Sequence, residues 1–181
     1  MGSGNPGRAA GEMTLIDFRS LGHLLRVAIL GIGHELRGDD SAGVVAARAL
    51  RQRAGTESWV DGSLQVWVVD AGSAPENYAG AVRRFRPDLV LLIDAADMDE
   101  APGTIRWLAW QDTSGLSAST HMLPPSIFAQ YLIQECGCQV ALIGIQPFDL
   151  SLGAPLSPPV QAAVDELVQA LSRSLGLRDA R

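Results

Sequence analysis

The stretch that most constrains the fold of this chain is Val27 to Val45, VAILGIGHELRGDDSAGVV. Its uncharged apolar run breaks at Gly31 and Gly33, passes through a polar turn, and continues from Asp39 as an Ala- and Val-rich segment with helical spacing. This pattern predicts a strand, a glycine-rich loop and a helix. Glycine permits the sharp turn, and the Asp39 carboxylate is expected to cap the helix. Because open α/β sheets bind ligands at the carboxyl ends of their strands, we expect this loop to border a functional site.

The rest of the chain alternates between strand and helix signals. Further apolar runs of strand length lie at 64–70, 89–93, 104–109 and 139–145. Helical patterns lie at 41–53, 76–85, 124–135 and 157–175, and residues 54–63 are expected to form a surface connection. Strands that alternate with helices favour a parallel sheet. Only DAADMDEAPG separates the third strand from the fourth, which is too short for a helical crossover, so the fourth strand is expected to be antiparallel.

These elements predict an α/β fold with three layers, in which helices cover both faces of a twisted, mostly parallel five-stranded sheet. The chain has 181 residues, 47% of them hydrophobic, which suffices for one sizeable core, and we expect a single domain over 25–176. Residues 1–24 are rich in glycine and polar residues. We expect them to form a disordered or loosely docked tail.

Charge and composition exclude several classes of function. The net charge is −6 and the arginines are scattered, which argues against a nucleic-acid or membrane-surface partner. The sequence contains no lysine, so a P-loop lysine and a Schiff-base lysine are excluded. No apolar stretch approaches the length of a membrane span, so no membrane insertion is expected. Cys136 and Cys138 lie too close together for a disulfide framework or a zinc ribbon, and they suit a reducing cytoplasm.

Three polar side chains are predicted to meet at one edge of this sheet. Asp40 begins the first helix, Asp94 ends the third strand, and His121 precedes the helix that leads into the last strand. If the fourth strand is antiparallel, the loop after it returns His121 to the carboxyl edge beside the two carboxylates. Carboxylate oxygens and an imidazole nitrogen suit a borderline divalent cation such as nickel or zinc, with positions open for water or substrate.

Each of these polar residues also has a structural interpretation. Capping explains one of the adjacent pair Asp39 and Asp40, and an Asp at a strand end, such as Asp94, often forms a turn. His34 in the glycine-rich loop can bond its own backbone or contact a substrate. The glycine pair is a weak nucleotide signal, because two acidic residues at the helix start would repel a phosphate. No GxSxG, HExxH or Cys/His pairing supplies a strong candidate for a covalent nucleophile.

Five segments occur in a characteristic order: GIGHELRGDDSAG, VDAGSAPENY, LLIDAADM, STHMLP and LIGIQP. Over residues 26–172 they resemble the hydrogenase maturation endopeptidases, which finish the large subunit of nickel-iron hydrogenases. SAPEN, DAADM and GIQP are most similar to the members that serve formate-hydrogenlyase-type hydrogenases. Two positions depart from the family pattern, which often has Asn in place of His34 and Gly in place of Ser41.

The resemblance implies a phosphorylase/hydrolase-like fold and an aspartic-type endopeptidase, which removes the C-terminal extension of a hydrogenase large-subunit precursor after nickel insertion. It implies that Asp40, Asp94 and His121 contact the nickel carried by the precursor, and that other divalent cations can occupy the same site. Asp40 and Asp94 are the candidate catalytic residues, and we expect Asp40 to orient or deprotonate the attacking water. The implied protein is cytoplasmic, and we expect it to act as a monomer. Spacing leaves open whether the mechanism is aspartic or metal-assisted.

Two other functions remain to be weighed against this one. A non-catalytic metal-binding assembly factor would use the same three ligands to hold nickel or dock the precursor without cutting it. Mass spectrometry of the precursor separates these two functions, because only a peptidase shortens it. A nucleotide-binding α/β domain would instead show nucleotide-dependent thermal stabilisation.

Overall fold

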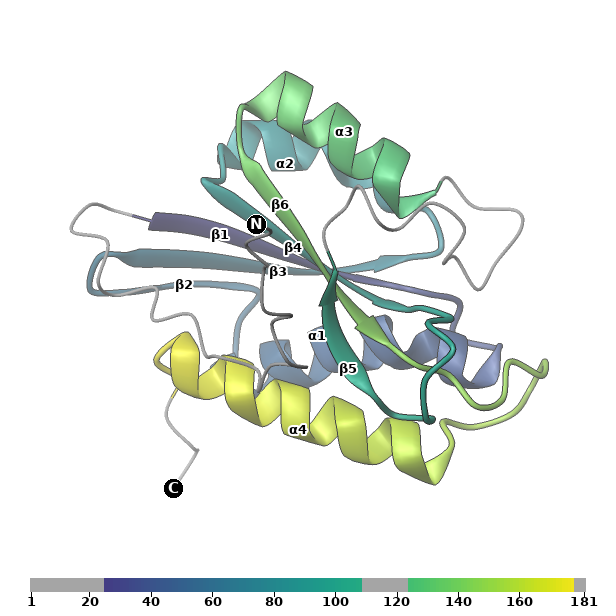
Figure 1. Ribbon diagram of the computed structural model, residues 1–181. Helices are drawn as coiled ribbons and strands as arrows, with labels where there is room; N and C mark the ends of the chain where they lie inside the picture. The colour runs from purple at the N-terminus through teal and green to yellow at the C-terminus, as the bar shows by residue number, and fades with distance from the viewer. Residues whose placement is uncertain (1–24, 109–123, 178–181) are drawn as a thin grey trace, which may run out of the picture.

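A six-stranded sheet in the order β2-β3-β1-β4-β6-β5 forms the centre of the protein (Figure 1). The computed structural model describes residues 25–108 and 124–177. The strands are β1 (Leu25–Ile32), β2 (Ser58–Asp61), β3 (Leu64–Gly72), β4 (Leu89–Ala95), β5 (Ile105–Leu108) and β6 (Gln139–Ile145). The neighbours β3, β1, β4 and β6 run parallel, while β2 and β5 pair antiparallel at the two edges.

Helices cover both faces of this sheet. They are α1 (Ala42–Ala54), α2 (Ala79–Phe85), α3 (Pro125–Cys136) and α4 (Pro158–Ser174), with short 3-10 turns η2 (Gly38–Ser41) and η3 (Pro75–Tyr78). Helices α1 and α4 pack together on one face, and α2 and α3 pack together on the other (Figure 1). This three-layer arrangement confirms the predicted α/β fold class.

Each face of the sheet has its own apolar core. Side chains of a strand alternate between the two faces. In β1, Val27 and Ile29 join the core under α1 and α4, while Ala28 and Leu30 join the core under α2 and α3. All four are fully buried. Burial on both faces explains why the central strands are uninterrupted apolar runs in the sequence.

Two glycines let the first helix approach the sheet closely. A Cβ atom on Gly31 in β1 would lie 2.1 Å from the carbonyl oxygen of Gly43 in α1. A Cβ on Gly43 would in turn lie 2.1 Å from the carbonyl oxygen of Ile93 in β4. Neither side chain would fit, so this contact requires glycine on both sides. The contact places the start of α1, and η2 before it, against the carboxyl ends of β1 and β4.

The number of strands differs from the prediction, because part of the expected connection at 54–63 forms strand β2. Its residues pair with the first half of β3 through a two-residue turn at Gly62 and Ser63. The strand lies at an edge and its side chains are exposed or half-buried, so it lacks the continuous apolar pattern of the central strands. Within the described residues, the sheet therefore has six strands and two antiparallel pairs, where five strands and one antiparallel strand were expected.

The remaining elements follow the predicted order. The fourth predicted strand, β5, is antiparallel to β6 at an edge, as its short connection required. The expected tail over 1–24 and the connection over 110–120 lie outside the described residues. Within 25–108 and 124–177, no helix combines the length and the apolar character needed to cross a bilayer.

Candidate active site

Asp40 and Asp94 lie at the carboxyl ends of two adjacent parallel strands. Asp94 is the penultimate residue of β4, and Asp40 lies in η2, which follows the loop after β1. Strands β1 and β4 pair directly, with Gly31 opposite Ile93. Both carboxyl groups are almost fully buried, each with 3% of its residue surface exposed. The structure therefore brings together two of the three side chains that the sequence nominated.

The two carboxyl groups influence each other electrostatically. Burial, together with the negative charge of Asp40, raises the pKa of Asp94 to about 8. Burial also raises the pKa of Asp40, although the backbone N–H of His34 and the charge of Arg37 act in the opposite direction. At neutral pH, Asp94 in this pair therefore carries a proton. Such a pair has excess negative charge when it is fully ionised, and a bound cation would relieve it.

The loop after β1 wraps around Asp40. The backbone N–H of His34 donates a 3.1 Å hydrogen bond to Asp40 Oδ2, and the His34 Nδ1 atom accepts one from the N–H of Leu36. Gly33 has a positive φ of 139°, and a Cβ there would lie 1.7 Å from the Asp40 carbonyl oxygen. Only glycine allows this turn, so the glycine-rich loop positions the carboxylate through its backbone.

Asp39 does not cap the first helix, which corrects the sequence prediction. Neither η2 nor α1 has a side-chain cap. The fully buried Asp39 carboxylate instead accepts four hydrogen bonds from the β6–α4 connection: from the N–H groups of Phe148, Asp149 and Ser157, and from the Ser157 hydroxyl, all at 2.7–2.9 Å. Burial alone would raise the pKa of Asp39, but these hydrogen bonds outweigh it and lower the pKa.

Gln146 organises the connection that follows Asp94, a role that the sequence analysis did not identify. This buried side chain directly follows β6. Its Oε1 atom accepts hydrogen bonds from the N–H groups of Met98 and Glu100, at 2.7 and 3.3 Å, and its Nε2 atom donates to Asp97 Oδ1 at 3.2 Å. A polar residue directly after a buried apolar strand, at the carboxyl edge, was the available signal.

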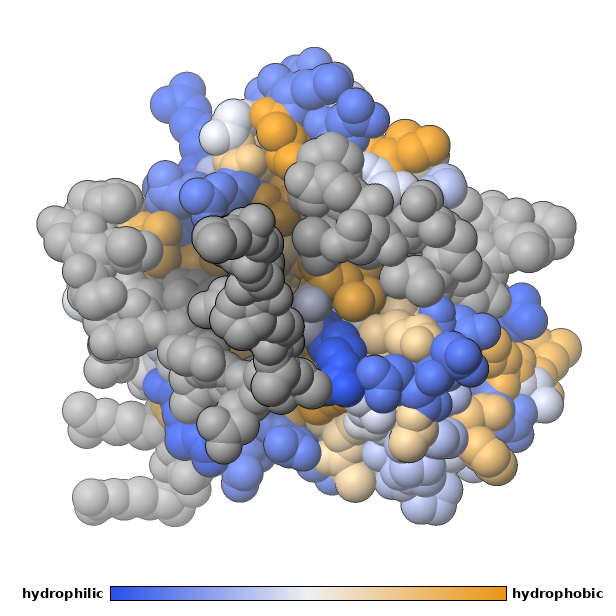
Figure 2. Space-filling model, in the orientation of Figure 1, coloured by the Kyte–Doolittle hydropathy of each residue, from blue (hydrophilic) through white to orange (hydrophobic). Residues whose placement is uncertain are grey.

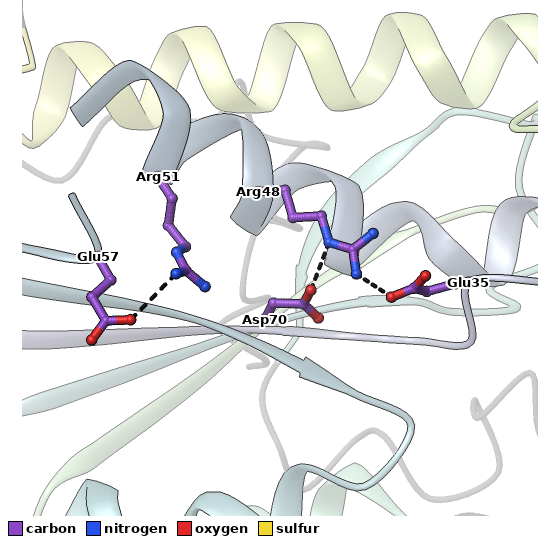
Figure 3. A network of polar contacts seen from close by, with 5 residues as sticks. All are labelled: Glu35, Arg48, Arg51, Glu57 and Asp70. Carbon is purple, nitrogen blue, oxygen red and sulfur yellow. Dashed lines mark hydrogen bonds and ion pairs between the residues drawn. The ribbon is translucent and has the colours of Figure 1, made fainter. Parts of the chain in front are cut away.

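A charged network joins α1 to the same edge (Figure 3). Arg48 in α1 pairs with Asp70 near the end of β3, with a 2.6 Å distance from Nε to Oδ2. The same guanidinium pairs with Glu35 in the loop after β1. A second pair, Arg51 with Glu57, lies further along α1. The Arg48 pairs are partly exposed, so each contributes little stability, but the pair with Glu35 links α1 to the loop that carries His34.

In the described part of the chain, pockets lie at both edges of the sheet. A pocket of about 300 Å³ at the carboxyl edge is lined by Gly33, His34, Glu35, Leu36, Gly72 and Ser73. A pocket of about 870 Å³ lies at the other edge, where Leu25, Leu89 and Gln139 begin their strands. Although it is larger, it is separated from Asp40 and Asp94 by the length of the strands. We therefore assign the candidate site to the carboxyl edge.

The third nominated residue, His121, lies outside the described residues. Among those described, no cluster of three or more His, Cys, Asp or Glu side chains is arranged to hold a metal ion. Asp40 and Asp94 could supply oxygen ligands to a cation, and a complete cation site would need a further ligand. A buried pair with one proton can also exchange that proton with a water or a substrate. The arrangement suits acid–base chemistry, cation recognition, or both.

Comparison with known proteins identifies relatives over most of the chain. Residues 44–174 match the family model HycI, hydrogenase maturation protease. The hydrogenase 3 maturation protease of Escherichia coli is 34% identical over 144 residues, which cover 79% of this chain and 86% of the relative. A putative hydrogenase maturation protease of Methanocaldococcus jannaschii is 31% identical over 146 residues, which cover 81% of this chain and 86% of that relative. Asp94 and His121 fall inside the range matched by the family model, and Asp40 lies just before it.

Solved structures of such proteases share this fold. The NiFe hydrogenase maturation protease HycI from Thermococcus kodakarensis superposes with a TM-score of 0.73 at 32% identity, over 83% of this chain and 92% of that one. A crystal structure of the hydrogenase 3 maturation protease gives a TM-score of 0.67 at 32% identity, over 85% and 92%. The likeness covers most of the chain and supports the α/β fold described above.

Proposed function

Since the chain belongs to the hydrogenase maturation protease family, and is therefore a hydrolase, we propose that it is an endopeptidase acting on a hydrogenase large-subunit precursor. In this proposal it removes the precursor's C-terminal extension after nickel has been inserted. The observation that carries the proposal is the buried pair Asp40 and Asp94 at the carboxyl edge of the sheet. The free cysteines Cys136 and Cys138 suit a reducing cytoplasm as the place of the reaction.

Recognition of nickel is supported by the chemistry of this pair. Two buried carboxyl groups repel each other when both are ionised, which contributes to the raised pKa of Asp94. A divalent cation that arrives with the precursor would displace the proton of Asp94 and bind an oxygen of each carboxylate. His121 is the proposed third ligand, and its imidazole nitrogen suits nickel better than a further carboxylate would. Binding the metal would hold the scissile peptide bond close to the site.

Asp40 is the proposed base. Its carboxylate would take a proton from a water as the water oxygen attacks the scissile carbonyl carbon, and would pass that proton to the departing amine. The loop N–H groups or the metal would stabilise the negative charge that develops on the carbonyl oxygen. Asp94, at the end of β4, would hold the cation and keep Asp40 oriented. Both aspartates would then be required for cleavage.

The test compares two forms of one precursor, loaded with nickel and free of nickel. Each is incubated with the purified protein, and the intact mass of the precursor is followed over time. We expect the nickel-loaded form to be shortened from its C-terminus and the nickel-free form to stay intact. Equal cleavage rates for both forms would reject recognition of the metal.

Variants of the carboxyl pair test in the same assay whether Asp40 and Asp94 are needed for cleavage. Asp40→Asn and Asp94→Asn keep the side-chain shape but cannot form a carboxylate, and each should reduce cleavage by about 10²-fold or more. The matched control is Asp165→Asn, which replaces an exposed carboxylate on α4 and should cleave at the wild-type rate. A protein that binds the loaded precursor without ever shortening it would be an assembly factor instead of a peptidase.

A further inference from the structure

Three large apolar side chains are exposed next to the candidate site. Leu36, Phe148 and Leu152 have 61%, 71% and 79% of their surface exposed, and we call them the rim patch. Leu36 lies in the loop between β1 and η2, and the other two lie in the β6–α4 connection. Figure 2 shows hydrophobic residues at the right-hand end of the molecule, where Figure 1 places the β6–α4 connection. The patch therefore belongs to the carboxyl edge.

Backbone hydrogen bonds hold the two loops of the rim patch together. The N–H of Gly153, next to Leu152, donates a 2.7 Å hydrogen bond to the carbonyl oxygen of Leu36. The N–H of Phe148 donates a 2.8 Å hydrogen bond to the buried Asp39 carboxylate. The N–H of Asp39 donates to the carbonyl oxygen of Asp149 at 2.8 Å. The polar backbone groups face inward, so the apolar side chains are displayed toward solvent.

The loop that carries Phe148 and Leu152 is held in a fixed conformation before any partner binds. A loop in which a buried carboxylate accepts four hydrogen bonds loses little further freedom on binding, and this reduces the entropic cost of association. Large apolar side chains on such a surface gain free energy when a partner excludes water from them. The other exposed large apolar residues of the described chain, Val60, Ile127 and Tyr131, lie on β2 and α3, away from these loops.

The loops that carry the rim patch also hold Asp39 and Asp40. Leu36 follows His34 by two residues, and the His34 N–H bonds the Asp40 carboxylate. Phe148 bonds Asp39, which is the neighbour of Asp40 in the chain. A polypeptide whose scissile bond reaches Asp40 therefore meets the same loops that carry these side chains. This argument favours the substrate of the protease over any other occupant.

We propose that the rim patch is the docking surface for an apolar segment of the precursor protein, close to the peptide bond that is cleaved. The inference rests on the proposed function and adds to it the means of substrate selection. The carboxyl pair would act on the bond and the metal, while Leu36, Phe148 and Leu152 would supply affinity for the polypeptide. The patch therefore governs KM, and kcat depends on the carboxyl pair.

The test is steady-state cleavage of the nickel-loaded precursor by rim-patch variants. Phe148→Ser, Leu152→Ser and the triple variant with Leu36→Ser should fold normally, because these side chains are exposed and their backbone bonds remain. We expect KM to rise by about tenfold for Phe148→Ser and further for the triple variant, with kcat within about twofold of wild type. The control is the double variant Val60→Ser and Ile127→Ser, which removes apolar side chains that are 64% and 52% exposed elsewhere and should keep the wild-type KM.

The outcomes separate this inference from the proposed function. If the wild-type protein fails to cleave the loaded precursor, the proposed function is wrong. If the wild-type protein cleaves it and the triple variant has an unchanged KM, the docking inference alone is overturned. An equal rise in KM for the control also overturns it. A wild-type dimer that the triple variant converts to a monomer without a change in KM would assign the patch to a contact between copies of this chain.

Discussion

Asp39 and Asp40 are neighbours in the chain and have opposite electrostatic environments. Four hydrogen bonds hold the Asp39 carboxylate in its ionised form and lower its pKa. Asp40 receives one backbone hydrogen bond, and burial raises its pKa. Asp39 thus supports the loops, and Asp40 is left available for a ligand or a proton. The same residue type serves structure at one position and the candidate chemistry at the next.

The pKa of Asp94 predicts a specific dependence of stability on pH. Its pKa is raised from 3.8 to about 8 on folding, so between these values the folded protein binds a proton that the unfolded chain releases. The contribution of Asp94 to the free energy of unfolding is therefore fully present below about pH 4 and is lost as pH rises toward 8. Asp94→Asn does not titrate, so its stability relative to wild type should increase by on the order of 2–4 kcal/mol between pH 5 and 8.

Urea unfolding of the substrate-free protein at several pH values measures this difference. The control Asp165→Asn removes one carboxylate from the exposed face of α4 and should keep the wild-type pH profile. A constant difference between Asp94→Asn and wild type from pH 5 to 8 would show that Asp94 is ionised throughout. The account of the carboxyl pair would then be wrong.

Replacing Asp39 should destabilise the protein more than replacing most surface aspartates. Asp39→Ala leaves three backbone N–H groups and one hydroxyl without their acceptor, which should cost about 3–5 kcal/mol in the free energy of unfolding at pH 7. Asp149→Ala, in the same connection, removes a half-buried carboxylate that accepts one hydrogen bond, from the N–H of Ser151, and should cost much less. Because the pKa of Asp39 is lowered on folding, its contribution should fade as pH decreases below 4.

Chemical denaturation at pH 7 and at pH 3.5 provides the comparison. Equal stabilities for Asp39→Ala and Asp149→Ala at pH 7 would contradict the assigned role of Asp39.

The sequence could not have predicted this role of Asp39. The partners of Asp39 lie more than 100 residues away in a loop without regular structure, and a cap at the adjacent helix was the local alternative.

At the scale of elements, the packing of α1 against the sheet positions the site. The carbonyl oxygens of Ile93 and Ile32 would lie 2.1 and 2.4 Å from a Cβ on Gly43. Gly43→Ala must therefore push α1 away from β1 and β4, and η2 with it. We expect the substitution to lower the free energy of unfolding by about 2–4 kcal/mol and to displace Asp40.

Gly80 in α2 supplies the matched control. A Cβ there meets only the end of the Arg84 side chain, at 3.6 Å. Gly80→Ala should therefore stabilise the protein by about 0.5–1 kcal/mol, as in other helices. Thermal unfolding of the two variants measures the contrast. A Gly43→Ala protein as stable as Gly80→Ala would contradict the close packing of α1.

The sequence predicted most elements because each one carries a strong local signal. The central strands are apolar runs buried on both faces, and the last helix has one apolar stripe facing α1 and the sheet. Strand β2 was missed because its four residues lie at an exposed edge. The dipeptide Gly62-Ser63, directly before Leu64, was the hairpin signal that could have identified it.

At the scale of the whole molecule, the two edges of the sheet differ in chemistry. The carboxyl edge collects buried carboxyl groups, the loops fixed by Asp39 and Gln146, and the rim patch. The sequence predicted that Asp40 and Asp94 share this edge, because both follow parallel strands. It could not predict the hydrogen-bond partners that fix the surrounding loops. The proposed meeting of Asp40, Asp94 and His121 is therefore the central claim.

The most direct measurement is a crystal structure of the full chain grown with nickel, in which anomalous scattering locates the metal. The account predicts one strong anomalous peak that is coordinated by oxygens of Asp40 and Asp94 and by a nitrogen of His121. The peak should disappear in crystals of Asp94→Asn. A metal bound elsewhere, or His121 at the amino ends of the strands, would contradict it.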